Sequence, residues 1–258
     1  MRMFLAVLLL TIFTNSKLQA QAPTVVNNFI KTVYINGHDS LPYRLLYPAN
    51  YNPHKKYPLI LFLHGAGERG SDNEKQLAVM PKVLTDSLGR KKYACFILAP
   101  QCTRNDVWVK FPNFPKILQA TDAPTPSARK TFELLDSLMS QLPLDKRRIY
   151  ITGYSMGGEG TFDFLIRRPG LFAAAAPVCS VSDTSKAKLI SKIPIWAFHG
   201  DQDDVNDVKY SRMMITCLKK HGSSAKYTEY PGVKHNSWRN AYTEPELFKW
   251  MFAQKLHD

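Results

Sequence analysis

Short apolar runs that alternate with helix-patterned segments constrain the fold of this chain most strongly. Leu59–Leu63 is apolar at every position, as a central strand must be when helices cover both faces of a parallel sheet. Similar runs occur at Cys95–Ala99, Phe172–Val178 and Ile193–Phe198. Between them, Ser127–Leu142 carries large apolar residues at the spacing of one helix face. This alternation predicts an α/β protein with one mostly parallel sheet of about eight strands, flanked by helices.

The other predicted elements continue this order. An antiparallel pair of strands opens the domain, joined through Asn36-Gly37, and a helix closes it. The remaining strands are Phe29–Ile35, Pro42–Tyr47, Arg148–Thr152 and Lys226–Tyr230, and the remaining helices are Met156–Arg167, Val205–Lys220 and Phe248–Leu256. Gln101–Thr125 differs, because prolines, asparagines and aromatic residues follow one another there without a period. A long irregular segment inside a compact domain is usually functional or disordered, and the aromatic residues favour a functional role.

Residues 1–20 are patterned as a secretory signal peptide. Arg2 supplies a positive charge, Phe4–Phe13 is apolar except for Thr11, and small Ala20 precedes the expected cleavage point. The apolar run is too short to cross a bilayer, which needs about 20 residues. No cysteine lies near the cut to carry a lipid. We therefore expect residues 21–258 to form a single domain that is secreted or periplasmic and has no stable membrane anchor.

The chain is basic, with a formal net charge of +13. Arg2 and Lys17 lie in the predicted signal peptide, which holds no acidic residue, so the mature chain carries 13 − 2 = +11. A basic surface could attract acidic polysaccharides or anionic membranes, but short lysine and arginine clusters are more typical of a solvated face. No nucleic-acid-binding motif accompanies them, and we expect no nucleic-acid partner.

The four cysteines have no short paired spacing of the kind that a zinc site needs. Cys95 lies inside an apolar run and is expected to be buried. Cys102 and Cys179 each follow the end of a predicted strand. In an oxidising compartment, a disulfide between these two at one rim of the sheet is therefore the pairing that we consider.

Gly153-Tyr154-Ser155-Met156-Gly157-Gly158 lies between a predicted strand and a predicted helix. This is the strand–turn–helix setting of a nucleophile elbow, in which a serine occupies a tight turn and needs small residues two positions to either side. Gly-x-Ser-x-Gly alone is weak evidence, since it also occurs in ordinary glycine-rich turns. Its position in this chain favours Ser155 as a nucleophile.

A serine hydroxyl needs a base, and His235 is the histidine best placed to act as one. It follows the predicted strand Lys226–Tyr230 and precedes the last helix, where a loop can reach the edge of the sheet. His199 ends a strand too early in the chain, and His221 stands just before Gly222, as a helix cap does. The remaining histidines lie before Ser155 or in the C-terminal tail: His38, His54, His64 and His257.

The acid that orients the base should follow the strand Ile193–Phe198. Four aspartates stand there, and composition alone does not separate them: Asp201, Asp203, Asp204 and Asp207. One of them would hold the imidazole tautomer, and the others would serve as loop or cap residues.

Ester chemistry also needs two N–H donors for the developing oxyanion. The backbone N–H of Met156, directly after the nucleophile, is one candidate. The loop after Leu59–Leu63 should supply the second, with Ala66 as the first choice and Gly67 as the alternative.

Five segments together resemble the carboxylesterase/phospholipase and putative-peptidase branch of the α/β-hydrolases, which is similar to the dienelactone-hydrolase and feruloyl-esterase groups. They are His64-Gly65-Ala66-Gly67-Glu68-Arg69-Gly70-Ser71-Asp72-Asn73, Ala99-Pro100-Gln101-Cys102, Gly153-Tyr154-Ser155-Met156-Gly157-Gly158, His199-Gly200-Asp201-Gln202-Asp203 and Tyr230-Pro231-Gly232-Val233-Lys234-His235-Asn236-Ser237-Trp238. The resemblance runs from about Tyr34 to the C-terminus, and five motifs in the correct order are more specific than any one of them.

The resemblance implies the α/β-hydrolase fold and decides between the aspartates, because the acid of His-Gly-x-x-Asp maps onto Asp203. It also implies that Ala66 and Met156 form the oxyanion hole. Aromatic residues of the loop after Ala-Pro-Gln-Cys tend to wall the substrate site in this family, which implicates Trp108. Gly65 and Tyr154, which adjoin the oxyanion loop and the nucleophile, are added as expected substrate-binding residues.

Two departures from the family pattern stand out. Val205-Asn206-Asp207 replaces the Val-Pro-like pair that usually follows the acid, so the acid loop is expected to bend differently. The nucleophile is a serine, not the cysteine of dienelactone hydrolases.

The resulting hypothesis is an exported serine esterase that acts on a small-molecule or carbohydrate ester, with acetyl and feruloyl esters as candidates. No cofactor or metal is implied, and the protein would be a monomer or a homodimer.

A secreted serine peptidase of the prolyl-oligopeptidase-like type is the main alternative, because esters and amides share the tetrahedral intermediate. A surface-active lipase is disfavoured because Gln101–Thr125 lacks an amphipathic helix, and a non-catalytic binding protein because the catalytic set is complete. The aromatic residues of Gln101–Thr125 either wall a substrate cleft or pack the loop, and Trp238 is expected to pack the histidine loop.

Overall fold

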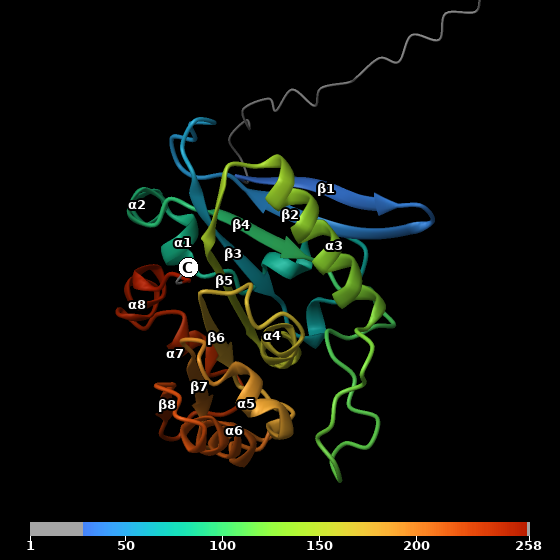
Figure 1. Cartoon of the computed structure of the whole chain (residues 1–258), viewed down its shortest axis with the longest axis vertical. Coiled ribbons are helices and arrows are strands. Elements are labelled where there is room, and N and C mark those ends of the chain that lie inside the picture. The colour runs from blue at the N-terminus through green and yellow to red at the C-terminus, as the bar shows by residue number, and fades with distance from the viewer. Residues whose placement is uncertain (1–27, 257–258) are drawn as a thin grey trace, which may run out of the picture.

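A single twisted sheet organises the computed structural model, which describes residues 28–256 (Figure 1). Its hydrogen-bonded strand order is β1-β2-β4-β3-β5-β6-β7-β8, and the strands are β1 (Phe29–Asn36), β2 (Asp39–Leu46), β3 (Tyr57–Leu63), β4 (Phe96–Pro100), β5 (Leu144–Tyr154), β6 (Ala174–Val178), β7 (Trp196–Gly200) and β8 (Lys226–Tyr230). β2 runs antiparallel to both β1 and β4, and every other pair is parallel. The predicted sheet and the α/β-hydrolase fold are confirmed.

Helices cover both faces of this sheet. The α-helices are α1 (Lys82–Thr85), α2 (Ser87–Lys92), α3 (Pro126–Gln141), α4 (Met156–Arg167), α5 (Ala187–Ile190), α6 (Lys209–Lys220), α7 (Trp238–Ala241) and α8 (Leu247–Ala253), and the 3₁₀ turns are η1 (Ala66–Glu68), η2 (Lys75–Leu77) and η3 (Thr184–Lys186). Apolar residues of α3, α4, α5 and α6 pack in one core cluster, and those of α1, α7 and α8 pack in the other. The sheet thus forms the middle of three layers.

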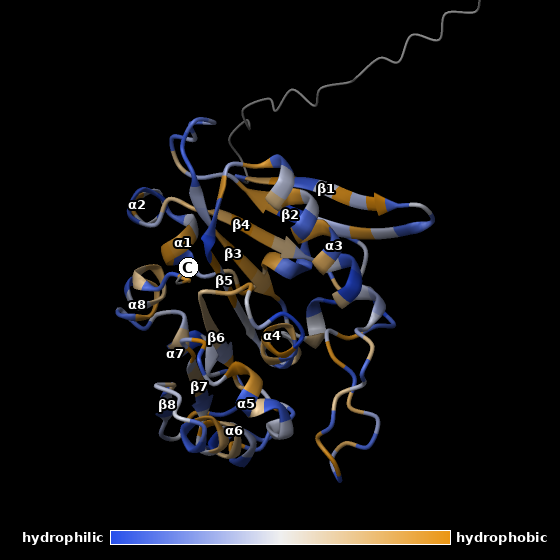
Figure 2. Ribbon diagram, viewed as in Figure 1, coloured by the Kyte–Doolittle hydropathy of each residue, from blue (hydrophilic) through white to orange (hydrophobic). Residues whose placement is uncertain are grey.

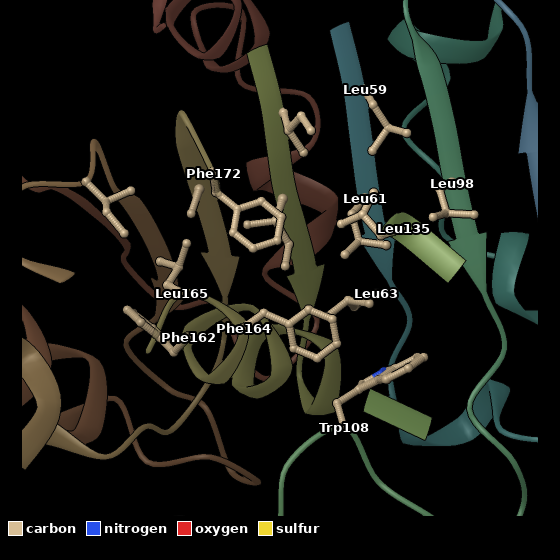
Figure 3. Packing of buried hydrophobic residues seen from close by; sticks show 14 of the residues in the cluster. Leu59, Leu61, Leu63, Leu98, Trp108, Leu135, Phe162, Phe164, Leu165 and Phe172 are labelled. Atoms are coloured by element: carbon tan, nitrogen blue, oxygen red, sulfur yellow. The ribbon is translucent and has the colours of Figure 1, made fainter. Parts of the chain in front are cut away.

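The alternation of side chains along β3 shows why the strand must be apolar throughout. Leu59, Leu61 and Leu63 belong to the cluster that contains α4, whereas Ile60 and Phe62 belong to the cluster on the opposite face. Figure 3 shows Leu63 beside Phe164 and Trp108, with Leu61 and Leu59 farther along the strand. In Figure 2 the central strands are coloured hydrophobic. Full burial of one such side chain contributes roughly 1.5–3 kcal/mol to stability.

The boundaries differ from the predicted ones where side chains hold the backbone outside a regular element. α6 begins at Lys209, not at Val205, because the Asp203 carboxylate accepts the N–H groups of Val205 and Asn206 at 2.9 and 2.8 Å. α1, α2, α5 and α7 were not predicted, since four to six residues are too few to display a helical period. His221 is the C-cap of α6, as expected.

The disulfide that the sequence suggested between Cys102 and Cys179 is wrong. All four cysteines lie in the described part of the chain and are free. Cys102 follows β4 and Cys179 follows β6, and β3 and β5 separate these two strands in the sheet. Three strand spacings correspond to about 14 Å, whereas a disulfide requires Cα atoms within about 7 Å.

The predicted signal peptide lies outside the described residues. Within residues 28–256, no helix is long and apolar enough to cross a membrane.

Candidate active site

Ser155 lies in a sharp turn between β5 and α4. Its backbone has φ of 54° and ψ of −124°, a left-handed φ that a residue with a side chain rarely adopts. The Ser155 N–H donates to the carbonyl of Val178 at 2.9 Å and ties the turn to the neighbouring strand. A strained residue held by the surrounding strands is typical of functional sites.

The two glycines that flank the serine are required by close backbone contacts. A Cβ on Gly153 would lie 2.4 Å from the carbonyl oxygen of Gly157. A Cβ on Gly157 would lie 2.0 Å from the carbonyl oxygen of Leu63, at the end of β3. The Gly-x-Ser-x-Gly pattern is therefore needed for the close packing of the turn against β3 and against itself.

The residues predicted as base and acid meet Ser155 at this edge of the sheet. His235, in the loop between β8 and α7, has Nε2 2.8 Å from Ser155 Oγ. Its Nδ1 lies 2.9 and 2.8 Å from the two carboxylate oxygens of Asp203, in the loop after β7. Trp238 packs edge-on against the imidazole with ring centroids 5.5 Å apart, which agrees with the expected packing role.

Each of the other three candidate aspartates has a different partner. Asp201 accepts the N–H of Gly232 at 2.7 Å, and Asp204 pairs with Lys234 at 3.1 Å. Asp207 pairs with Lys209 at 2.8 Å. Only Asp203 among these four aspartates contacts the imidazole of His235 in the described structure.

Asp203 is held as a carboxylate by its partners. Burial raises the pKa of Asp203, but hydrogen bonds from His199, His235 and the backbone outweigh it and hold the pKa well below its usual range. One of these backbone donors is the N–H of Asn206. A proline at this position, as in the Val-Pro-like pair, has no N–H to donate. The departure from the family pattern thus adds a hydrogen bond to the acid.

The loop that follows β3 is ordered by a buried histidine. The N–H of Cys102 donates to His64 Nε2 at 2.9 Å, so Nδ1 carries the proton and donates to the carbonyl of Gly65 at 2.6 Å. Burial lowers the pKa of His64 to about 4, which keeps the imidazole neutral. Trp108 Nε1 donates to the carbonyl of His64 at 3.0 Å. The backbone of the expected oxyanion loop is thus fixed from two sides.

Ala66 and Met156 are the first residues of η1 and α4. The N–H groups at the start of a helix have no partner within the helix, so both residues have a donor to offer. Ala66 is exposed, as a donor that faces a substrate should be.

Three expected substrate-binding residues are instead parts of the protein interior. Trp108 is fully buried and packs with Phe164 and with His64, so it does not wall a cleft (Figure 3). Tyr154 is 3% exposed and packs on Trp238 with ring centroids 4.9 Å apart. Gly65 is buried against that ring, and a Cβ there would lie 2.7 Å from Tyr154 Cε2. These residues support the site and are not open to a substrate.

Two side chains beside the triad were not predicted to take part in the site, those of Glu159 and His199. Glu159 stands one helical turn after Ser155, and burial raises its pKa to about 7. The Asn206 amide donates to its carboxylate at 3.5 Å. The spacing of four residues from the nucleophile would have identified Glu159 as a neighbour of the site. The contacts of His199 depend on how the acid loop folds, which no spacing indicates.

Ligand atoms of Cys179, Asp203 and His235 lie within 4.8 Å of one another, and no other such group occurs between residues 28 and 256. Burial raises the pKa of the Cys179 thiol, whereas a metal ligand must be a thiolate. The carboxylate and imidazole already bind each other. The arrangement therefore fits the triad better than a metal site.

Comparison with known proteins places this chain in a family. The family model described as phospholipase/carboxylesterase matches residues 50–244. A thermostable esterase of known structure is 36% identical, with a TM-score of 0.81 over 89% of this chain and 64% of the esterase.

Two curated relatives are similar over part of their length. Feruloyl esterase D of Neurospora crassa is 25% identical over 205 residues, which is 75% of this chain and 63% of the relative. A bifunctional acetylxylan esterase/xylanase of Neocallimastix patriciarum is 26% identical over 159 residues, which is 61% of this chain. This chain spans 21% of the length of that bifunctional relative and less than two thirds of the others named here. The family match covers well over half of the chain, which therefore belongs to the phospholipase/carboxylesterase family of α/β-hydrolases.

Proposed function

We propose that this chain hydrolyses carboxylic esters through an acyl-enzyme on Ser155. The observation that carries the proposal is the continuous hydrogen-bonded series from Ser155 Oγ to His235 Nε2, at 2.8 Å, and from His235 Nδ1 to Asp203, at 2.8 Å. A nucleophile within reach of a base, and a base within reach of an orienting acid, define this type of catalysis.

The reaction has two steps. Ser155 Oγ bonds to the ester carbonyl carbon while its proton moves to His235 Nε2, and the N–H groups of Ala66 and Met156 stabilise the oxyanion. The bond to the alcohol oxygen then breaks, and the alcohol leaves with the proton from His235. Water attacks the acyl-enzyme, His235 takes its proton and returns it to Ser155, and the carboxylic acid leaves. Asp203 stabilises the imidazolium in both steps.

The substrate class that we propose is an acetyl or feruloyl ester of a carbohydrate. Relatives with acetylxylan esterase and feruloyl esterase names support this choice. A hollow of about 500 Å³ lies beside the loop that carries His235, and its lining includes His235, Asn236, Trp238 and Asn240 together with the charged residues Asp204 and Lys234. Amides and aromatic rings suit a hydroxyl-rich ligand. Two larger hollows, of about 620 and 780 Å³, have no triad residue in their linings, so the chemistry favours the smaller one.

Export from the cytoplasm is part of the proposal. It rests on the signal-like pattern of residues 1–20.

The test is hydrolysis of a panel by the protein that begins at Gln21. The panel contains 4-nitrophenyl acetate, methyl ferulate, acetylated xylan and an aminoacyl anilide, and the variants are Ser155→Ala, His235→Ala and Asp203→Asn. We expect ester cleavage that falls by about 10³-fold or more in each variant. Ester cleavage that survives Ser155→Ala would overturn the proposal, and cleavage of the anilide alone would establish a peptidase.

A further inference from the structure

We propose that His199 is a positioning residue that holds the Asp203 carboxylate in the orientation required by the base. The inference rests on the proposed function and adds a residue to its machinery. His199 is the last residue but one of β7, four residues before Asp203. Its Nε2 lies 3.0 Å from Asp203 Oδ2, and both side chains are fully buried.

The two oxygens of Asp203 are held in different ways. Oδ1 accepts the N–H groups of Val205 and Asn206, at 2.9 and 2.8 Å. Oδ2 has no backbone donor among the described residues, and its partners are His235 Nδ1 at 2.8 Å and His199 Nε2 at 3.0 Å. Among the described residues, His199 is thus the one group besides the base that contacts Oδ2, and together with the two backbone donors on Oδ1 it fixes the plane of the carboxylate.

The surroundings of His199 determine which ring nitrogen carries the proton. Nε2 faces two acceptors, the Asp203 carboxylate and the carbonyl of Asn206 at 2.9 Å, so it must be the donor. Nδ1 lies 2.7 Å from Ser211 Oγ, on α6, and this hydroxyl also lies 3.3 Å from the carbonyl of Ser180. The imidazole therefore has a partner at each nitrogen, and α6 anchors the far side of the ring.

This geometry ties the orientation of His235, which accepts the proton of Ser155, to two regular elements, β7 and α6. The ring is carried by β7, its Nδ1 is held by α6, and its Nε2 holds the acid that orients His235. If the carboxylate could rotate, His235 would face Ser155 for a smaller fraction of the time. The rate would fall, because catalysis depends on the position of the reacting groups to within a fraction of an ångström. Loss of the His199 donor should therefore lower kcat and leave KM nearly unchanged.

Two amide variants provide a matched pair that separates positioning from packing. The longer side chain of His199→Gln places an N–H donor near the former Nε2, within reach of Asp203. His199→Asn is one methylene shorter, so its amide can replace Nδ1 beside Ser211 but not Nε2. We expect kcat for 4-nitrophenyl acetate to fall about 10–100-fold in His199→Asn and less than about fivefold in His199→Gln, with KM within about twofold in both.

The same pair is then measured in the Asp203→Asn background. If His199 acts through the Asp203 carboxylate, His199→Asn should lower kcat by less than about twofold there, whereas a purely structural effect would repeat the full loss. Thermal unfolding by circular dichroism identifies which variants are folded. Equal losses in the two folded amide variants, an unchanged kcat in His199→Asn, or the same loss in both backgrounds would overturn the inference. Activity that persists in Ser155→Ala would instead overturn the proposed function.

Discussion

At the scale of single residues, the site contains buried titratable groups whose charge states follow from their partners. Asp203 has donors on both oxygens and remains ionised, whereas His64 is neutral because burial opposes its cationic form. Glu159 differs from both residues, because the hydrogen bond that its carboxylate accepts in the described structure is a long one, from Asn206 at 3.5 Å. Because so few contacts offset the cost of burying its charge, this carboxyl group should change its protonation state near neutral pH.

Glu159 should make the folded protein less stable as the pH rises. Burial raises its pKa from 4.5 to about 7. Between these values the unfolded chain releases a proton that the folded chain retains, so the free energy of unfolding decreases with pH and levels off above pH 7. The change should be at most about 3 kcal/mol. Urea unfolding at pH 5 and pH 8 measures it, and Glu159→Gln should remove this part of the pH dependence.

The matched control for Glu159 is Glu246→Gln. Glu246 is exposed and pairs with Lys249 at 3.1 Å on the surface. It should follow the wild-type pH dependence. A Glu159→Gln variant that also followed it would show that Glu159 ionises alike in the folded and unfolded chains.

At the scale of elements, the reactive turn depends on the contact between α4 and β3. Gly157→Ala would place a Cβ 2.0 Å from the carbonyl oxygen of Leu63, so the helix or the strand must shift. We expect a loss of about 1–3 kcal/mol in the free energy of unfolding, together with a large loss of kcat because Ser155 moves. Gly170→Ala is the control, since its Cβ would meet nothing within 4 Å. Equal urea midpoints for the two variants would contradict this packing argument.

The irregular segment Gln101–Thr125 is attached to the oxyanion loop through Trp108. Trp108→Phe removes the donor to the His64 carbonyl and part of the buried ring. We expect a loss of about 1–3 kcal/mol in stability and a lower kcat, because the carbonyl is left unpaired at the base of the loop. Phe114→Ala, at a position that is 45% exposed, should leave the thermal midpoint unchanged. A wild-type kcat in Trp108→Phe would show that this tryptophan does not support the oxyanion loop.

The elements that the sequence predicted are those whose pattern arises from burial. β3, β4 and α4 were predicted because strands buried on both faces and strand–turn–helix units leave a regular signature. The interior position of Trp108 was not predicted, since a tryptophan among prolines and asparagines reads equally as a cleft wall or as packing. The acid shows the same limit, because four neighbouring aspartates have the same chemistry until the loop after β7 folds and selects Asp203. The motifs thus predicted the residues of the site, whereas the contacts that support these residues are visible only in the structure.

At the scale of the whole molecule, the sheet determines which distant residues can meet. Its order places β5 between β3 and β6, so the oxyanion loop, the nucleophile and the residues after β6 adjoin one another at one edge. The same order keeps Cys102 and Cys179 apart, since β3 and β5 lie between their strands. A fold that assembles the triad in this way therefore excludes that disulfide.

The thiols provide a test of this arrangement in the whole molecule. Burial raises the pKa of Cys95 and of Cys102 to about 12 and also raises that of Cys179, so these thiols should be unreactive at neutral pH. Cys217 is partly exposed. We expect 5,5′-dithiobis(2-nitrobenzoic acid) to titrate Cys217 rapidly in the folded protein and all four thiols in guanidinium chloride, and we expect dithiothreitol to leave the thermal midpoint unchanged. Cys217→Ser should abolish the rapid phase. Two thiols in denaturant, with a midpoint lowered by reductant, would instead reveal a disulfide, which this strand order does not permit between Cys102 and Cys179.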